Sequence, residues 1–538
     1  MKNYTVDKDP YMSGGFKNMW KIYKGTPKTR PGSASVFVFE KKALDKFSKE
    51  EREEVLNILR REVTSLAKYK HPNVLGIYEL LLEDKSTLVF VTEYINFSLS
   101  SWIETGNISK LEVKLMISQL CQVISFFHEN AKIIHSNLTP NNIFIDEKGQ
   151  IKVSGLCFLL NDPPITGVET KYNTYMHNAL PNLKFTAPEI VFDATTYYQS
   201  DLFSLGAIIY FLVSKTAKDK SINTDDLIAL NSNSYEAYKK FFESGFDKKL
   251  SNLEGLETED VDIVIQLLNR TYSRRPTILE FSEDSWFNDP KLKALKFVES
   301  LESNDMSKNT EFLGKFPSII TFFDNKIIEK RFLPVFMNAL KIEGLIVSTL
   351  PCVFAISEKA EISFEKVIWP SLKTLFQHKH IPAAALFYIL SRLNYIAENI
   401  SNTEFSSNMF SIVCKALDCG VPKIQSVVLD NLNFIIKKVD SMNFKNQLFP
   451  RLVNIVTTTT SNSLKIQILK AFKSAYSLLD QNIINESLLN TLEKIRKGDN
   501  NELTCISLVD IYEEIAKVVS VEVLLYLHSQ LQIKFCRI

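Results

Sequence analysis

The sequence predicts a two-lobed α+β domain in residues 1–287, followed by an all-α solenoid of HEAT-like repeats in residues 288–538. Alternating strand-like runs such as Val36-Phe37-Val38-Phe39 occur in the first part. After Trp286-Phe287 the pattern becomes helical and amphipathic, rich in Leu, Ile and Phe and poor in glycine. There a short aromatic–proline signature returns in steps of 36 to 41 residues, a period typical of paired-helix repeats.

Composition excludes several classes of function. The 538 residues carry 63 Lys+Arg and 62 Asp+Glu, so the charge balance predicts neither a nucleic-acid partner nor direct binding to an anionic membrane. The N-terminus is polar and no apolar run is long enough to span a bilayer. The seven cysteines are scattered without a C-x-x-C pair, which predicts free thiols and no metal site. We therefore expect a cytoplasmic protein.

The loop from His135 to Asn142 has the pattern of a protein-kinase catalytic loop without its base. In active kinases, H-R-D-L-x-x-x-N supplies an Asp that accepts the substrate proton and an Asn that holds magnesium. Here Asn137 stands at the Asp position, and a neutral amide cannot accept that proton. Thirteen residues after Asn142, Gly155 stands where a D-F-G motif would supply a metal-binding Asp.

The first strands also lack the groups that hold ATP. Gly14 and Gly15 occupy the place of the glycine-rich phosphate loop, but two adjacent glycines and then Asn18 are a poor version of that loop and favour an ordinary β-turn. The phosphate-binding lysine of V-A-I-K falls on Phe37, whose ring is expected to fill the pocket. Lys41 lies four residues further along, about 13 Å away at the rise of a strand, and cannot replace it.

Three positions of the nucleotide pocket keep kinase-like residues. Glu62 lies nine residues before His71, the spacing of the helix-C glutamate that normally pairs with the missing lysine. It could serve a residual cofactor role or lie on a solvated helix face. Thr92 occupies the gatekeeper position, and the backbone from Glu93 onward could still offer hydrogen bonds to adenine.

The large-lobe scaffold retains its motifs in order. Ala187-Pro188-Glu189 matches A-P-E, and Arg275 matches the arginine that pairs with this glutamate. Asp201 lies in a helix-F motif and is expected to accept backbone hydrogen bonds from the catalytic loop. His135 is assigned a structural role in that loop. The order and spacing of these motifs predict a kinase fold.

We predict that this domain is not an enzyme, because Phe37, Asn137 and Gly155 remove the phosphate clamp, the base and a metal ligand. Asn142 alone is a poor magnesium site, so we expect no metal, no cofactor, and weak or absent ATP binding. The alternative is a weakly active Ser/Thr kinase, which requires magnesium-dependent ATP binding.

The helical part is expected to bind partner proteins. Its repeated signature begins at Phe332, Ile368, Met409 and Leu448, and more faintly near Ser487 and Val523. A compact helical bundle is the alternative, but it does not account for the recurrence. Stacked repeats present long faces for other proteins and need capped ends, and we expect the first domain to serve as the N-terminal cap.

A degraded kinase domain followed by such repeats resembles the Scy-one-like pseudokinases, and within them the coated-vesicle-associated branch. The resemblance covers nearly the whole chain and is carried by residues 20–26, 36–42, 135–145, 180–182, 187–189 and 449–451. It implies a trafficking scaffold at the trans-Golgi network and endosomes that binds clathrin-linked coat or adaptor proteins. Membrane association would then be peripheral and through partners. Other branches imply a Golgi-coat or tRNA-export scaffold.

Overall fold

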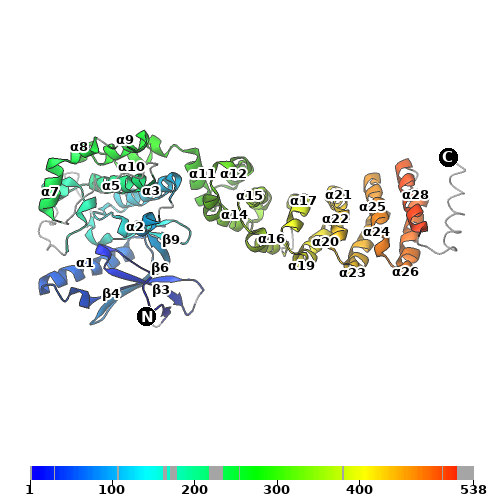
Figure 1. Cartoon of the computed structure of the whole chain (residues 1–538), viewed down its shortest axis with the longest axis horizontal. Helices are drawn as coiled ribbons and strands as arrows, with labels where there is room; N and C mark the ends of the chain where they lie inside the picture. Colours follow the sequence, from blue (N-terminus) through cyan, green and yellow to red (C-terminus); the bar gives the residue numbers. More distant parts are fainter. Residues whose placement is uncertain are drawn as a thin grey trace. The chain divides into compact units, whose positions relative to one another are not determined.

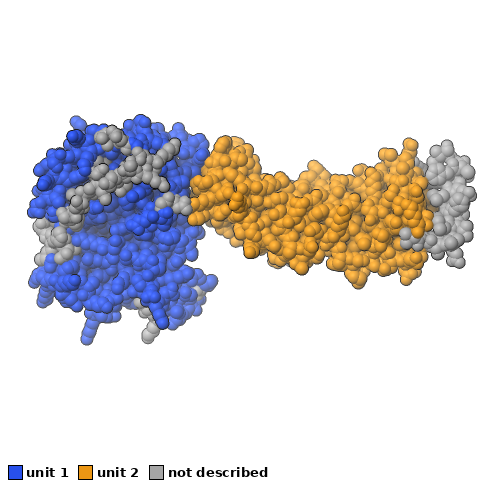
Figure 2. Space-filling model, viewed as in Figure 1, with its two compact units in different colours: residues 1–298 blue, residues 299–538 orange. Residues whose placement is uncertain are grey.

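The structure is a computed structural model with two compact units, residues 1–298 and 299–538, coloured separately in Figure 2. It describes residues 3–29, 31–105, 108–161, 167–169, 179–216, 234–251, 253, 255–377, 381–499 and 501–517. The fold class predicted from the sequence is confirmed: the first unit has a sheet lobe and a helical lobe, and the second is helical. The sequence pattern places the domain border at residue 287, and the compact units divide eleven residues later, after Val298.

The small lobe, drawn in shades of blue in Figure 1, is an antiparallel six-stranded sheet. Its strand order is β1-β3-β4-β6-β5, with β2 paired to β3. Its outer face carries a cluster that includes Tyr4, Val36 and Val91, while the rings of Phe37 and Phe90 belong to the opposite face, as strand alternation requires. The strands are β1 (Tyr4–Val6), β2 (Met12–Gly14), β3 (Trp20–Pro27), β4 (Ala34–Glu40), β5 (Ile77–Glu83) and β6 (Thr87–Glu93).

Helix α1 (Lys49–Lys68) is the counterpart of kinase helix C. Ser48 and Glu51 form a capping box at its start, so each side chain binds the other residue's backbone amide. The helix buries an apolar stripe that includes Val55, Leu59 and Leu66. Glu62 lies on this buried side and not on a solvated face.

The large lobe combines helices with short strands. Strands β7 (Ile95–Ser98), β9 (Ile143–Asp146) and β10 (Ile151–Val153) form a three-stranded sheet, and β8 (Ile133–Ile134) pairs with β11 (Leu160–Asn161). Strand β12 (Val168–Glu169) pairs with β13 (Thr195–Thr196). The described helices are α2 (Leu99–Glu104), α3 (Lys110–Ser125), α4 (Pro188–Phe192), α5 (Tyr198–Thr216), α7 (Tyr235–Ser244), α8 (Phe246–Leu250), α9 (Thr258–Leu267), α10 (Ile278–Ser282) and α11 (Pro290–Glu299).

The second unit repeats one helical hairpin. A five-residue π segment precedes each of the first helices named below, and a three-residue turn of α-helix precedes the π segment in every case except that of Phe364–Ile368. The π segments are Ile328–Phe332, Phe364–Ile368, Phe405–Met409, Phe444–Leu448 and Ile484–Leu488. They lead into α14 (Leu333–Ala339), α16 (Trp369–Phe376), α20 (Phe410–Asp418), α24 (Phe449–Thr458) and α27 (Leu489–Gly498).

The second helices of the hairpins form the other layer of the array. They follow α12 (Met306–Ile319) and are α15 (Ile346–Lys359), α17 (Ala383–Ser391) with α18 (Leu393–Glu398), α21 (Pro422–Asp430) with α22 (Leu432–Lys438), α25 (Asn462–Ala475) and α28 (Glu502–Ala516). Successive second helices contact one another, as α21 contacts α17 and α25. This nearest-neighbour stacking is that of a solenoid. The faint signature near Val523 lies outside the described residues.

Proline accounts for part of the π geometry. Pro334, Pro370 and Pro450 are the second residues of their helices, and each lacks the N–H that an α-helical bond would use. Ser411 and Asn490 take the same place in α20 and α27, where the π segment is still present. The π segment therefore belongs to the repeat and does not depend on proline alone.

Among the described residues, no single helix has the length and apolar character needed to cross a membrane. The sharply bent helix pair Asn325–Ala339 and Glu343–Lys359, with 116° between its arms, meets those criteria only when the two are taken together. These helices form the first hairpin of the second unit, where their residues Phe336, Leu350 and Val353 are buried.

Candidate functional site

The catalytic-loop counterpart is held from below by Asp201 on α5. Its two carboxylate oxygens each accept a backbone N–H at 2.8 Å, from His135 and Ser136, and His128 donates to the same carboxylate at 3.0 Å. The His135 ring donates from Nε2 to the Ser154 carbonyl at 3.0 Å, and burial lowers the pKa of this imidazole. Through these contacts His135 helps to fix the conformation of the loop.

A second anchor lies at the start of α4. Ala187 precedes this helix and Pro188 is its first residue, where the missing N–H costs nothing. Glu189 accepts two parallel bonds from the Arg275 guanidinium at 2.7 and 2.8 Å, and also a bond from Ser200 at 2.6 Å. The Arg275 side chain is fully buried, so this bidentate pair ties α4 to the loop before α10 in a dry setting.

Asn137, at the position of the catalytic base, faces inward. Its Nδ2 group donates to the Gly155 carbonyl at 3.0 Å and to the Cys157 sulfur at 3.4 Å. The residue is 6% exposed. Its amide group therefore donates hydrogen bonds that hold the turn at Gly155 and Cys157 in place. A catalytic Asp at this position would instead accept a proton.

Gly155 adopts the left-handed conformation with φ of 77°. A Cβ atom here would lie 2.5 Å from the Asn142 side chain, so an Asp cannot be placed without moving the loop. Asn142 in turn donates to the Asn137 carbonyl at 2.9 Å, and its Oδ1 atom is buried without a hydrogen-bond partner among the described residues. The two metal-binding positions of a kinase are thus packed against each other.

Glu62 has exchanged a lysine partner for neutral donors. The Trp20 indole N–H donates to its Oε2 at 3.0 Å, and the Gly155 amide donates to its Oε1 at 3.1 Å. Burial raises the pKa of this carboxyl to about 7, and the two hydrogen bonds partly oppose that shift. Glu62 therefore joins α1 to β3 and to the Gly155 turn.

Aromatic rings fill the space next to Glu62. The Phe37 ring stacks on Phe90 with centroids 4.5 Å apart and meets Phe144 edge-on at 5.8 Å. Trp20 packs edge-on against Phe90 at 4.9 Å, and Trp20 and Phe37 are at most 2% exposed. Such offset and edge-to-face packing adds stability beyond the burial of area. The phosphate-clamp position has become part of a hydrophobic core.

The hinge that could receive adenine is already hydrogen-bonded within the chain. The Ile95 amide donates to the Ser35 hydroxyl at 3.0 Å, and the Ile95 carbonyl accepts from the Tyr11 hydroxyl at 2.8 Å. The Thr92 hydroxyl donates to the Glu93 carbonyl at 2.8 Å. The sequence indicates that this backbone could offer hydrogen bonds to adenine, whereas in the structure side chains from β4 and from the segment before β2 use it.

The two-glycine loop closes onto the catalytic loop. Gly14 ends strand β2, and Gly15 donates its amide to the Asn141 carbonyl at 3.2 Å. Phe16 is buried and packs against Phe158, with ring centroids 5.7 Å apart. A phosphate loop needs free amides directed at its ligand. Here the amide of Gly15 contacts protein and Phe16 is part of the core.

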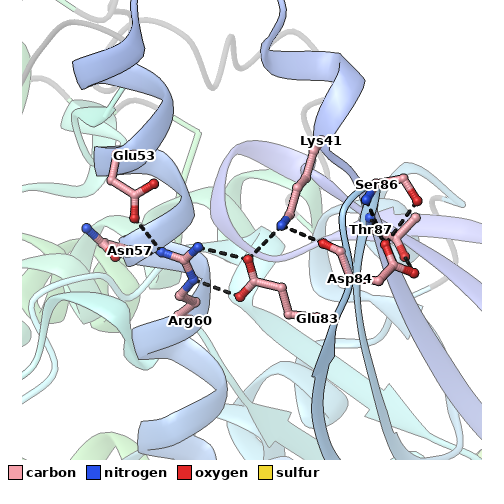
Figure 3. A network of polar contacts seen from close by, with 8 residues as sticks. All are labelled: Lys41, Glu53, Asn57, Arg60, Glu83, Asp84, Ser86 and Thr87. Carbon is pink, nitrogen blue, oxygen red and sulfur yellow. Dashed lines mark hydrogen bonds and ion pairs between the residues drawn. The ribbon is translucent and has the colours of Figure 1, made fainter.

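Lys41 takes no part in the cleft. Its ammonium binds the Glu83 carboxylate and the Asp84 carbonyl, both at 2.7 Å (Figure 3). Glu83 also accepts two bonds of 2.8 Å from Arg60 on α1, so the β5–β6 turn is fixed to that helix. These contacts hold α1 from its outer side, while Trp20 and Gly155 hold it through Glu62 from the inner side.

A kinase domain implies ATP with magnesium, and the residues present do not fit that group. Side chains of Phe37 and Trp20 fill the clamp region, and the hinge groups of Ile95 are already bonded. Asn142 offers one amide oxygen, and the described residues contain no group of three or more His, Cys, Asp or Glu side chains able to hold a metal ion. Magnesium binding usually requires carboxylates.

Three residues important for this arrangement were missed from the sequence. Trp20, Ser35 and Tyr11 supply the donors and acceptors that replace ligand contacts at Glu62 and the hinge. Ser35 lies two residues before Phe37, where V-A-I-K has its alanine, and this substitution was a visible signal. Tyr11 matches no motif, and Trp20 begins the segment 20–26 that carries the family resemblance, but the contacts of both side chains are visible only in the tertiary structure.

Known proteins are similar to this chain in both its kinase-like part and its helical part. Residues 34–287 match the protein kinase domain family. Human SCY1-like protein 2 is 25% identical over 504 residues, which cover 90% of this chain and 53% of the human protein. Protein kinase-like protein SCY1 of Saccharomyces cerevisiae is 26% identical over 94% of this chain and 68% of its own length. The chain thus spans about half the length of the human relative.

A third relative bears on activity. It is the Dictyostelium discoideum protein named probable inactive serine/threonine-protein kinase scy1, 23% identical over 81% of this chain and 44% of its own length. All three matches are longer than the kinase domain and continue into the helical unit. The similarity therefore runs across both units in the same order, and the chain resembles the Scy1-like proteins over most of its length.

Proposed function

We propose that this chain is a catalytically inactive scaffold that recruits coat or adaptor proteins in vesicle traffic between the trans-Golgi network and endosomes. The proposed lack of catalytic activity rests on the filled cleft. There Trp20, Phe37 and Ser35 contact the groups that would otherwise contact a nucleotide. The trafficking part rests on the family resemblance. It includes clathrin-linked partners, a cytoplasmic location, and membrane association through partners.

The helical repeats supply the partner-binding surface in this proposal. Large apolar side chains are exposed near the starts of first helices, with Val367 43% and Met442 64% exposed. An exposed apolar residue can anchor a partner when it enters a pocket of that partner. The small lobe offers a matched comparison, because Leu80 on β5 is 64% exposed. Substitutions on the repeats and at Leu80 can therefore test whether partners bind to the repeats or to the small lobe.

The test is affinity purification of the full chain from cells, with quantitative identification of coat and adaptor proteins. We expect Val367→Glu combined with Met442→Glu to reduce recovery of those partners by roughly ten-fold, the effect of losing one good anchor. Leu80→Glu should leave recovery unchanged. Loss of partners with Leu80→Glu alone would move the binding surface to the lobe. Recovery of only tRNA-export factors or another class of coat would refute the clathrin-linked assignment.

A further inference from the structure

Strand β5 carries three large apolar side chains that are exposed to solvent. It is the last strand in the order of its sheet, so its outer edge pairs with no strand among the described residues. Tyr78 is 45%, Leu80 64% and Leu82 50% exposed. Edge strands are usually protected by charged side chains, because an apolar edge attracts another chain. This edge therefore has the character of an interaction surface.

Exposure alternates along β5. Tyr78, Leu80 and Leu82 are exposed, whereas Glu79 and Leu81 between them are partly buried. The three exposed side chains, called the β5 ridge below, thus follow the two-residue period of a strand. The pairing of β5 with β6 is irregular at two places, and such bulges disrupt a regular ladder. A second chain would therefore bind the ridge mainly through side chains and not through a continuous row of backbone hydrogen bonds.

The β5 ridge is symmetric in its spacing. Leu80 stands in the middle, with Tyr78 two residues before it and Leu82 two residues after it. When two copies meet antiparallel with Leu80 opposite Leu80, Tyr78 of each copy lies opposite Leu82 of the other. Every side chain of the ridge then meets an apolar side chain, as a self-complementary two-fold contact requires. A shift of one copy by two residues would instead set Tyr78 opposite Asp84.

The charges beside the ridge do not oppose this contact. Glu83 ends β5, and its carboxylate is bound by Lys41 at 2.7 Å and by Arg60 at 2.8 Å (Figure 3). Like charges directly opposite each other destabilise a pair of strands. In the symmetric register Glu79 of each copy lies opposite Leu81 of the other, so no two carboxylates face each other.

We propose that the β5 ridge is a contact between two copies of this chain, arranged antiparallel about a two-fold axis at Leu80. A second copy is favoured over a different protein because the spacing of the ridge matches itself. The contact is small, so we expect a transient dimer with a Kd of about 10 µM. The inference does not depend on the proposed function, which assigns coat and adaptor proteins to the helical repeats.

Sedimentation velocity of the full chain, at concentrations from about 1 to about 100 µM, tests the proposal. We expect an equilibrium between monomer and dimer. Leu80→Glu should raise the Kd at least about ten-fold, because two carboxylates would then meet at the axis. Phe97→Glu is the matched control, since Phe97 on β7 is 43% exposed in the same unit but lies outside the ridge, and it should leave the Kd unchanged. A thermal melt verifies that each variant is folded.

A mixed sample tests the two-fold register. Leu80→Glu and Leu80→Lys should each be monomeric alone, whereas an equimolar mixture should form a dimer, because opposite charges then face each other at the axis. Three outcomes would overturn the proposal. The first is a monomer even at about 100 µM, and the second is a dimer that a folded Leu80→Glu variant does not weaken. The third is a mixture that associates no more than either variant alone.

Discussion

The nucleotide cleft and the base of the large lobe differ in how they treat the kinase positions. At the base, Glu189 and Arg275 form their buried pair, and Asp201 holds the catalytic-loop backbone. In the cleft, Phe37 and Gly155 have replaced charged positions, and both are packed by neighbouring side chains. The difference shows that the anchors of this fold do not depend on the groups that perform catalysis.

A physical reason connects the two regions. Charged groups that await a ligand are costly to keep in a closed site, because each needs solvation or a partner. Rings such as Phe37 and Trp20 instead bury apolar area and pack edge-to-face, which stabilises the lobe without any ligand. Burial raises the pKa of Glu62 to about 7, so this carboxyl holds its proton at pH values where a solvated glutamate is ionised. The filled cleft therefore supports the proposal that this domain acts as a scaffold and not as a catalyst.

The largest effect is expected at the base. Arg275→Ala leaves Glu189 buried without its cation and should lower the unfolding free energy of the first unit by about 3–5 kcal/mol. Arg270→Ala is the matched control, because its ion pair with Asp247 is partly exposed and should contribute less than about 1 kcal/mol. Urea titrations read by hydrogen exchange in α4 and α5 measure both. If both variants lost the same unfolding free energy, the buried Glu189–Arg275 pair would contribute no more to stability than an exposed ion pair.

The cleft should resist restoration of its metal ligand. Gly155→Asp forces a side chain into Asn142, so we expect a loss of about 2–4 kcal/mol from backbone strain and overlap together. Gly420→Asp tests strain alone, since its φ of 69° is similar and nothing lies within 4 Å of the added Cβ. Phosphate transfer by Gly155→Asp combined with Asn137→Asp is expected to stay at background. A folded, active double variant would contradict this reading of the cleft.

A smaller and pH-dependent effect is expected at Glu62. Its folded pKa of about 7 exceeds the ordinary value of 4.5, so the folded state holds a proton that the unfolded state releases. Stability should therefore fall by up to about 3 kcal/mol as pH rises from 4.5 to 7, and then level off. Glu62→Gln should remove this segment of the profile, whereas the exposed Glu50→Gln should keep it. If stability depended on pH in the same way in the wild type and in Glu62→Gln, the raised pKa of this buried carboxyl would be refuted.

The sequence predicted those features that a motif defines. Glu189, Arg275 and Asp201 could be placed because each belongs to a spaced pattern, and Phe37, Asn137 and Gly155 could be identified as replacements on the same alignment. The repeats were predicted from their period, which the recurring π segments share. Their i→i+5 geometry was not predicted.

Apart from Phe37, the side chains that fill the cleft could not be derived from the sequence. Trp20 reaches Glu62 across 42 positions, and Tyr11 reaches Ile95 across 84, so both contacts exist only once the sheet has formed. The pairing of Lys41 with Glu83 likewise depends on which way a turn points. The sequence showed which ligand-binding groups were replaced, while the structure shows what took their place.

The most direct test of the filled cleft is a thermal-shift titration of the full chain with ATP and magnesium. A ligand at 100 times its Kd adds about 2.7 kcal/mol to folding stability, so even weak specific binding would raise the melting temperature. We expect no rise at millimolar ATP, with or without chelator. A rise that a chelator abolishes would show a magnesium–nucleotide site and contradict the account.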